Sequence, residues 1–342
     1  MKKLLKAILF VIVLLLSLFI LFYLLTWGDY EVAKTVEQDP DIPHIEIGGV
    51  VFHAETFGSD TNDVVIVLHG GPGNDFRYLL ELKELANEYF VVFYDQRGTG
   101  LSPRVPADEL SLESSLQDLH SIVNFYSPDR KVILIGHSWG GMLASGYIGL
   151  YPEKVNKAIL GEPGMLTSET ANIFMERTNG MMPEMSLRLL WNIGKIWFKS
   201  LHLNGPDNQA KGDFLFENIA MLNDPDNPML GYFCNRDMSN TNYPYWRMGF
   251  TSSMSISRKA MNEGGDMQIN LVEGVDQFNG GVLFLTGECN TIIGEDIQKL
   301  HMTYFNYAQL KIIKDAGHNM ITEQPEICIN LIRDFLQRPT SL

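Results

Sequence analysis

The chain has 342 residues, and its hydrophobic fraction of 45% is ordinary for a globular protein with one large domain or two modest ones. Its formal net charge of −15 argues against nucleic-acid binding, because affinity for phosphate depends on clustered Lys and Arg. Cys234, Cys289 and Cys328 show no CxxC spacing, so we expect buried free thiols rather than a disulfide framework or a zinc site.

The first segment predicts a membrane anchor. Three lysines within the first six residues precede an apolar run from Ala7 to Leu25 that only Ser17 interrupts. This run matches the ~20 residues that a helix needs to cross a bilayer. Its length, and the lack of a small-residue cleavage motif, favour an uncleaved anchor over residues 1–28 rather than a signal peptide. The lysines place the N-terminus in the cytoplasm, so we expect the remaining chain to be membrane-anchored and extracytoplasmic.

Beyond the anchor, short runs of β-branched and aromatic residues alternate with helical spacing. This alternation predicts a mostly parallel sheet with helices on both faces, the α/β class. The predicted strands are 45–51, 53–56, 64–68, 90–94, 131–135, 157–160, 281–286 and 309–313, and the predicted helices are 76–87, 112–126, 141–147 and 325–337.

The alternation stops in the middle of the chain. We find no convincing buried strand between Gly161 and the strand at 281–286, but helical pieces near 168–178, 186–200, 214–222 and 252–262. We therefore predict a core made of 29–162 and 279–342, with a helical cap insertion, 163–278, over the strand ends where α/β sheets bind ligands. The Met and aromatic residues of this insertion, Trp191 and Trp197 among them, line a pocket or form the insertion's own small core.

A serine stands at the turn after the strand at 131–135, in Gly136-His137-Ser138-Trp139-Gly140. Glycines on both sides of Ser138 permit a strained turn and a close approach of neighbouring elements. The hydroxyl is thereby held where a base can reach it. The first amides of the following helix favour developing negative charge. Ser138 is therefore the predicted nucleophile.

His318 is the predicted base. It lies in Asp315-Ala316-Gly317-His318-Asn319, after the last strand and before the last helix. The order serine, acid, histidine is the one used by hydrolases with this strand-turn-helix serine. We expect His318 to take the proton from Ser138 and return it to the leaving group.

Two further loops follow buried strands. His69-Gly70-Gly71-Pro72-Gly73 can offer a backbone amide to an oxyanion, with the amide of Trp139 as the second donor. The loop at 95–102, DQRGTGLS, is expected to support the site structurally. The glycine-rich loop has no phosphate-binding lysine and no metal-ligand cluster is visible, so we predict no cofactor and no metal.

These motifs together resemble the α/β-hydrolase superfamily and, within it, the proline iminopeptidase family. The matching motifs are HGGPG at 69–73, DQRGTGLS at 95–102, GHSWGG at 136–141 and AGHNM at 316–320. The resemblance runs from about residue 45 to the end of the chain, although the insertion matches only in position and helical character.

The resemblance implies Ser138 as nucleophile, His318 as base, and Gly71 with Trp139 as oxyanion donors. It also implies cleavage of an N-terminal residue, often proline, from a peptide. However, the family places its catalytic aspartate where this chain has Asn290, in Gly287-Glu288-Cys289-Asn290. An amide can orient an imidazole but cannot stabilise an imidazolium by charge.

We predict that Glu162, directly after the strand at 157–160, replaces the missing acid. Certain haloalkane dehalogenases, which are α/β-hydrolases, carry the acid at the end of this strand. Glu288 is one alternative, and a histidine without a carboxylate partner is the other.

Three functions remain open at this stage. The leading prediction is an aminopeptidase that releases prolyl-type N-terminal residues from small peptides. An esterase or lipase-like hydrolase is the second, and a non-catalytic binding protein is the third. The expected partner is thus a small-molecule or peptide substrate. An acidic pocket for the substrate's ammonium would support the aminopeptidase, and a purely apolar pocket the esterase. The candidates for ammonium recognition are Glu169, Glu176, Glu184 and Glu217.

Overall fold

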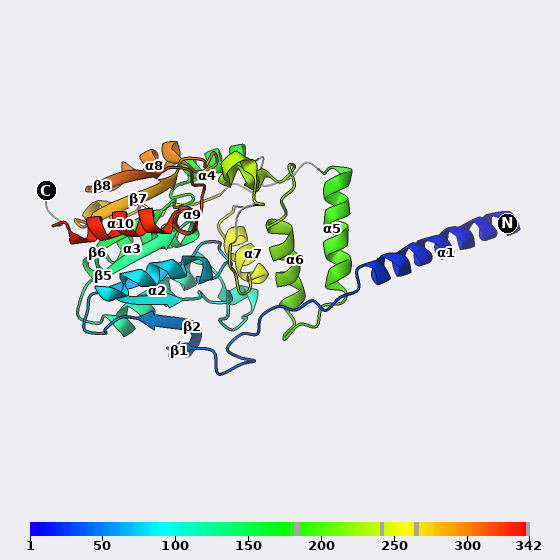
Figure 1. Ribbon diagram of the computed structural model, residues 1–342, viewed down its shortest axis with the longest axis horizontal. Coiled ribbons are helices and arrows are strands. Elements are labelled where there is room, and N and C mark those ends of the chain that lie inside the picture. Colours follow the sequence, from blue (N-terminus) through cyan, green and yellow to red (C-terminus); the bar gives the residue numbers. More distant parts are fainter. Residues whose placement is uncertain (179, 181–184, 240–242, 263–266, 340–342) are drawn as a thin grey trace.

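The computed structural model describes residues 1–339 apart from 179, 181–184, 240–242 and 263–266. Its centre is one eight-stranded sheet with the order β1-β2-β4-β3-β5-β6-β7-β8 (Figure 1). β2 pairs antiparallel with β1 and β4, and all the other pairs are parallel. The strands are β1 His44–Ile47, β2 Val50–Phe57, β3 Val64–Leu68, β4 Phe90–Tyr94, β5 Val132–His137, β6 Val155–Gly161, β7 Gly281–Gly287 and β8 Ala308–Ile313.

Eight strands were predicted and the described residues form eight, but the division between the first two was wrong. The predicted break between 45–51 and 53–56 lies instead at Gly48-Gly49. Both glycines have positive φ values, 60° and 83°, a conformation that other residues adopt only with strain. The turn therefore comes at these two residues, and β2 continues without a break from Val50.

The helices cover both faces of the sheet. The α-helices of the described residues, including those of the cap and the N-terminal helix that lie away from the sheet, are α1 Lys2–Leu25, α2 Leu112–Tyr126, α3 Trp139–Leu150, α4 Ser168–Arg177, α5 Leu187–Ser200, α6 Ala210–Ala220, α7 Phe250–Lys259, α8 Glu295–Met302, α9 Met320–Glu323 and α10 Pro325–Gln337. The helix predicted at 76–87 is a 3₁₀ helix, η1 Arg77–Asn87. α8 was not predicted from the sequence.

Side chains alternate between the two faces of β3. Ile66 and Leu68 belong to the cluster that contains α2 and α3, whereas Val65 and Val67 belong to the cluster that contains η1 and α10. All four are completely buried. Burying each such side chain contributes about 1.5–3 kcal/mol, which explains why this parallel strand is apolar at every position.

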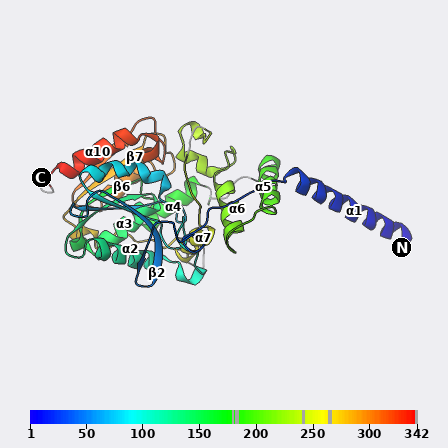
Figure 2. The same cartoon turned by 60° about the horizontal axis from the view of Figure 1, so that its bottom comes forward.

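Between β6 and β7 the described chain is helical, with α4 to α7, and we refer to residues 163–278 as the cap. In two views α5, α6 and α7 lie between the sheet and α1 (Figures 1 and 2). A buried carboxylate joins cap helices to the core: Asp213 of α6 accepts hydrogen bonds from Arg104 Nε at 2.9 Å and Arg247 Nε at 2.7 Å. It also accepts from the backbone N–H of Phe250 at the start of α7. The exact division into core and cap stays a prediction.

The expectation of three free thiols was wrong. Cys234 of the cap and Cys289 after β7 form a disulfide, and Cys328 is free and buried. The two paired cysteines are 55 positions apart in sequence, so no short spacing motif indicates that they form a disulfide. The fold brings their Cα atoms to 4.8 Å, within the range that a disulfide requires.

α1 is a continuous helix of 24 residues with no buried side chain, and it is apolar from Ala7 to Leu25 apart from Ser17. At 1.5 Å per residue this apolar part is about 29 Å long, which matches the ~30 Å hydrocarbon core of a bilayer. Its mean hydropathy reaches 3.3. Length and composition suit a membrane span or a signal sequence alike, and the extracytoplasmic orientation stays a prediction.

Candidate active site

Ser138 occupies a strained turn between β5 and α3, with φ 54° and ψ −117°. A Cβ on Gly136 would lie 2.3 Å from the carbonyl oxygen of Gly140, and a Cβ on Gly140 would lie 2.1 Å from that of Leu68. Both positions therefore require glycine, which is the physical reason for the G-x-S-x-G pattern. The N–H of Ser138 donates to the carbonyl of Gly161 at 2.8 Å and holds the turn against β6.

Glu162 and His318, 156 residues apart in sequence, meet beside this turn. His318 Nδ1 lies 2.6 Å from Glu162 Oε2. Glu162 is completely buried, and His318 is 7% exposed. Glu288, the alternative acid, is exposed and accepts a hydrogen bond from the backbone N–H of Asp315 at 3.3 Å. Of the two carboxylates considered from the sequence, Glu162 is thus the one that reaches the ring.

The carboxylate of Glu162 is surrounded by donors. Thr286 Oγ1 donates to Oε1 at 2.6 Å and the N–H of Gly287 donates to it at 2.8 Å. Asn290 Nδ2 donates to Oε2 at 2.5 Å, the oxygen that also faces His318. Burial raises the pKa of this carboxyl well above its usual value, while the hydrogen bonds from Thr286, Asn290 and Gly287 act to lower it, because these donors favour the ionised form, which only accepts.

Asn290 is held in place by its other amide atom. Its Oδ1 accepts the backbone N–H groups of Ile292 at 2.8 Å and Ile293 at 3.2 Å. This fixes the direction in which the Nδ2 group donates, toward Glu162. The amide that stands in the position of the family's acid therefore contacts the displaced carboxylate.

Burial also sets the protonation of His318. It lowers the pKa of the imidazole to about 3, so the ring is neutral near pH 7 and can accept a proton. Its ring stacks on Tyr232 of the cap, with centroids 4.3 Å apart. The backbone N–H of His318 donates to the carbonyl of the same tyrosine at 2.7 Å.

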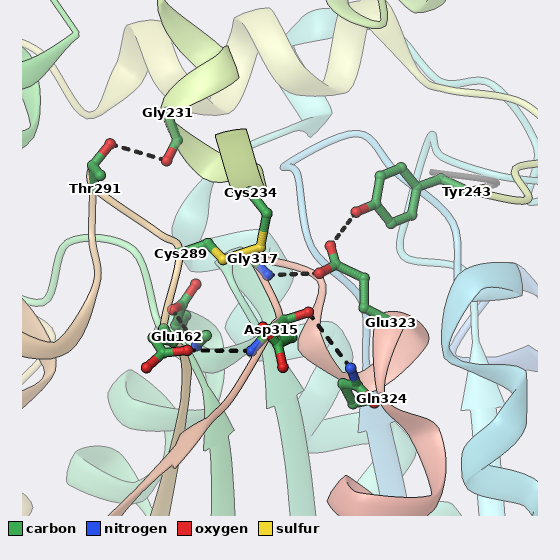
Figure 3. The surroundings of a disulfide bond; sticks show 12 residues. Glu162, Gly231, Cys234, Tyr243, Cys289, Thr291, Asp315, Gly317, Glu323 and Gln324 are labelled. Carbon is green, nitrogen blue, oxygen red and sulfur yellow. Dashed lines mark hydrogen bonds between the residues drawn. A yellow bond between two sulfur atoms is a disulfide. The ribbon is translucent and has the colours of Figure 1, made fainter. Parts of the chain in front are cut away.

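The disulfide lies next to this cluster, as Figure 3 shows beside the side chain of Glu162. Cys234 follows Tyr232 by two positions, and Cys289 directly precedes Asn290. The bond therefore ties the segment that covers His318 to the segment that contacts Glu162. Figure 3 also shows Glu323, which accepts from Gly317 N–H at 2.6 Å and from the hydroxyl of the cap residue Tyr243.

A hydrogen-bond chain that sequence reasoning missed joins the glycine-rich loop to the histidine loop. The N–H of Gly70 donates to Tyr78 Oη at 2.8 Å, and this hydroxyl donates to His137 Nδ1 at 2.7 Å. His137 Nε2 in turn donates to the carbonyl of His318 at 2.8 Å. Burial lowers the pKa of His137 well below its usual value, which agrees with this neutral tautomer. The sequence signal was a histidine directly before the serine.

Gly71 and Trp139 lie with Ser138 around one cavity. Gly71 has a φ of 122°, and a Cβ there would lie 2.3 Å from Gly73 N, so the loop requires glycine. Trp139 is the first residue of α3, where no preceding helical turn exists to accept its N–H. An N–H without a helical acceptor next to the serine is what one donor of an oxyanion site requires, so Trp139 fits the predicted role.

The loop at 95–102 supports the cavity wall. Trp139 Nε1 donates to Gln96 Oε1 at 2.8 Å, and Gln96 Nε2 donates to the carbonyl of His69 at 3.0 Å. Asp95 is completely buried and accepts from the N–H groups of Phe76 and Leu101. The loop thus orients the indole beside the serine and the start of the glycine-rich loop.

The cavity at Ser138 has a volume of about 140 Å³, and none of the described residues that line it is charged. Among the candidates for ammonium recognition, Glu169 and Glu176 are exposed and Glu217 is half-buried. None of these three lines the cavity. Glu184 lies outside the described residues. The apolar side chains of the lining include Met165, Phe174, Met229, Ile256, Met267 and Ile269.

A mostly parallel sheet with helices on both faces and a serine at the sharp turn after β5 are the features of an α/β hydrolase. The chain matches the family described as "alpha/beta hydrolase fold" over residues 63–325 and belongs to it. This confirms the predicted fold class and superfamily, and it makes the protein a hydrolase of that superfamily.

Individual relatives point to more than one activity. A proline iminopeptidase of Heyndrickxia coagulans is 42% identical over 101 residues, which cover 29% of this chain and 34% of that protein. Human epoxide hydrolase 4 is 24% identical over 305 residues, covering 86% of this chain and 78% of that protein. The segments matched to the first four curated relatives span only about a third to a half of those proteins, at 30%, 34%, 52% and 31%.

Solved structures share the fold. The proline iminopeptidase of Mycobacterium smegmatis superposes with a TM-score of 0.58 at 17% identity, covering 86% of this chain and 97% of that one. A mutant epoxide hydrolase from Bacillus megaterium superposes with a TM-score of 0.61 at 17% identity, covering 86% and 100%. At such identities the likeness extends to the architecture alone.

Proposed function

We propose that the protein is a serine hydrolase of carboxylic esters with small apolar groups, and that Ser138, His318 and Glu162 form its catalytic triad. The observation that carries this proposal is the 2.6 Å contact between His318 Nδ1 and Glu162 Oε2 beside the strained serine turn. With Nδ1–H directed to the carboxylate, Nε2 is the ring nitrogen that can act as base.

The proposed reaction has two halves. Ser138 Oγ bonds to the substrate's carbonyl carbon while its proton moves to His318 Nε2, and the carbonyl oxygen becomes an oxyanion held by the N–H groups of Gly71 and Trp139. The alcohol leaves with the proton from His318. Water then attacks the acyl-serine with the same proton transfers and releases the acid. Glu162 stabilises the imidazolium in both halves.

A serine nucleophile favours acyl substrates over epoxides. Attack of Ser138 on a carbonyl carbon leaves an ester, which water hydrolyses by the same steps. Attack on an epoxide carbon would leave an alkyl ether, which lacks a carbonyl and would block the enzyme. The likeness to epoxide hydrolases therefore supports the architecture, while the residue at the turn supports acyl transfer.

The cavity supports ester rather than peptide substrates. A free N-terminal ammonium requires a charged or strongly polar partner when it is buried. None of the described lining residues provides a carboxylate. A volume of about 140 Å³ is below the roughly 300–1,000 Å³ of drug-sized ligand pockets, so short acyl or alcohol groups fit best.

Full-length protein in detergent tests the proposal. We expect turnover of short-chain aryl esters and covalent labelling by a fluorophosphonate probe, both lost in Ser138→Ala. Cys328→Ser, a change at a buried thiol remote from the serine turn in sequence, is the control and should keep both signals. Labelling that persists in Ser138→Ala would reject the nucleophile.

Prolyl aminopeptidase activity is the second candidate. The 42% identity to a proline iminopeptidase over 101 residues favours it. Glu217 is the candidate ammonium partner to test, because it is half-buried whereas Glu169 and Glu176 are exposed, although its carboxylate does not line the cavity at Ser138. Prolyl and alanyl anilides, assayed beside the esters, distinguish the two: anilide turnover lost in Glu217→Gln would replace the esterase proposal.

We also propose that α1 anchors the protein, with the catalytic part outside the cytoplasm. The disulfide between Cys234 and Cys289 supports this compartment, because disulfides persist in oxidising environments and are rare in the cytosol. The three lysines ahead of the span agree with a cytoplasmic N-terminus. Protease added to spheroplasts or sealed vesicles of known orientation should digest the catalytic part only from the outer side.

A further inference from the structure

The cap helix α5 exposes an apolar stripe. At 100° per residue its exposed large side chains fall on one side of the helix. On the opposite side, Leu189 and Ile196 are buried against the cap. The α5 stripe consists of Leu187, Leu190, Trp191 and Trp197, with exposed fractions of 87%, 46%, 54% and 43%.

The α5 stripe adjoins the last turns of α1. Phe22 of α1 packs against Trp191 and Phe198 with ring centroids 5.2 Å and 5.5 Å apart, and Phe19 packs against Phe198 at 5.4 Å. Just beyond α5, His202 Nε2 donates to the carbonyl of Tyr23 at 2.9 Å. Both views show α5 running across the axis of α1, between α1 and the rest of the cap (Figures 1 and 2).

These contacts set the depth of α5 relative to a membrane. Phe19 precedes the end of α1 at Leu25 by six residues, or about 9 Å along the helix axis. Helices that lie in the membrane interface bury their apolar faces by about 5–10 Å. If α1 spans the bilayer, a helix packed on Phe19 and Phe22 and lying across α1 is at that depth.

The charge of α5 fits the same environment. Its sequence contains Arg188, Lys195 and Lys199 and no acidic residue, in a chain whose net charge is −15. The three cations lie along one edge of the stripe, where long basic side chains can reach lipid headgroups. Arg188 Nε also donates to Asp224, which keeps this edge attached to the cap. Trp and Leu beside a basic edge are typical of interfacial helices.

We propose that the α5 stripe inserts into the leaflet from which α1 emerges, so that the cap is docked on lipid acyl chains and lies between the membrane and the sheet. The proposal rests on the proposed membrane anchor and is independent of the catalytic assignment. The occupant of the stripe is therefore lipid rather than a second copy of the chain.

Tryptophan quenching tests this placement in the full-length chain. Trp27 is replaced by Phe to remove the anchor's own indole, and the protein is reconstituted into phosphatidylcholine vesicles with or without bromine on the upper acyl chain. The fluorescence contribution of Trp197 is the emission of this chain minus the emission of the same chain carrying Trp197→Phe. We expect bromine to reduce that contribution by at least about twofold, because an interfacial indole touches the upper acyl carbons.

A matched pair of charge substitutions gives the second measurement. Leu190→Glu in the stripe should remove the bromine effect on Trp197, whereas Leu150→Glu, at a 58% exposed position at the end of α3, should leave it unchanged. An equal bromine effect in both variants would overturn the proposal. So would a Trp197 contribution that bromine leaves unchanged, the result expected if a second copy covered the stripe.

Alkaline carbonate extraction separates this proposal from the anchor. If the protein stays in the membrane pellet but Trp197 is not quenched, the docking of α5 is rejected and the membrane anchor is not. Protein that carbonate releases rejects the membrane span, and with it the depth on which the docking depends. Ester turnover measured on the same vesicles reports the catalytic proposal separately.

Discussion

Replacing Glu162 by Gln removes the charge of the proposed acid and keeps its size. The carboxylate accepts from four donors: Thr286, Gly287, Asn290 and His318. An amide has one oxygen and an NH₂ group that only donates. If its oxygen faces Thr286 and Gly287, its NH₂ faces Asn290 Nδ2 and His318 Nδ1. The imidazole would then have to turn its proton to Nε2, which is the wrong tautomer for a base.

The expected loss follows from the same geometry. An Asp-to-Asn change with this effect on the tautomer lowers kcat by about 10,000-fold, or about 5 kcal/mol of barrier at 1.36 kcal/mol per factor of ten. We expect a loss of that order in kcat for a short-chain aryl ester in Glu162→Gln. Thermal unfolding should accompany the assay, to show that the variant is folded at the assay temperature.

Glu288→Gln is the matched control, because it removes the other carboxylate considered from the sequence. That side chain is exposed and bonds the backbone N–H of Asp315. Its activity should therefore stay close to that of the unmodified chain. A folded Glu162→Gln variant within about tenfold of the unmodified chain would refute the role that we give to Glu162. A large loss in Glu288→Gln alone would move that role to Glu288.

Four further predictions concern the site and its supports. Because burial lowers the pKa of His318 to about 3, kcat/KM should not fall by half near pH 6.5, the usual imidazole value, but only at lower pH; a pH profile checks this. Between pH 6.5 and about pH 3 the imidazole is protonated in the unfolded chain but neutral in the folded one, so the free energy of unfolding should decrease as pH falls through this range. Asn290→Ala removes one hydrogen bond to a charged group, worth about 1.5–3 kcal/mol, and should lower kcat by roughly 10- to 100-fold with little change in KM. Replacing both Cys234 and Cys289 by Ser should lower the free energy of unfolding by up to about 4 kcal/mol, the chain-entropy value for a 55-residue loop. A reductant should destabilise the unmodified chain but not the double variant, and an equal effect on the two would contradict the prediction. Asp213→Asn weakens the buried partner of two arginines and should cost about 3–5 kcal/mol in urea unfolding; a change below about 1 kcal/mol would argue against the proposed role of this carboxylate.

The sequence by itself determined the sheet and the serine turn. Apolar β-branched runs as short as five residues, such as Val64–Leu68, can be buried on both faces only within a covered parallel sheet. The G-x-S-x-G pattern around Ser138 predicts the turn from the sequence. The structure gives the physical reason, because a Cβ on either glycine would lie too close to backbone atoms. Local spacing of this kind is what a single sequence can show.

The identity of the histidine's partner needed the tertiary structure. Asn290 occupied the expected position of the acid, and Glu162 was the predicted replacement, with Glu288 or no carboxylate partner as the alternatives. The fold decided among them, because the carboxyl ends of β6 and β7 place Glu162 between Asn290 and His318. The disulfide escaped prediction for a related reason: Cys234 and Cys289 meet only when the cap folds back over the end of β7. From periodicity alone, Trp191 and Trp197 of α5 could have lined a pocket or a core, and only the structure shows that both are exposed and that Trp191 contacts Phe22 of α1. Contacts between segments far apart in sequence depend on the whole chain's path, and no local pattern encodes them.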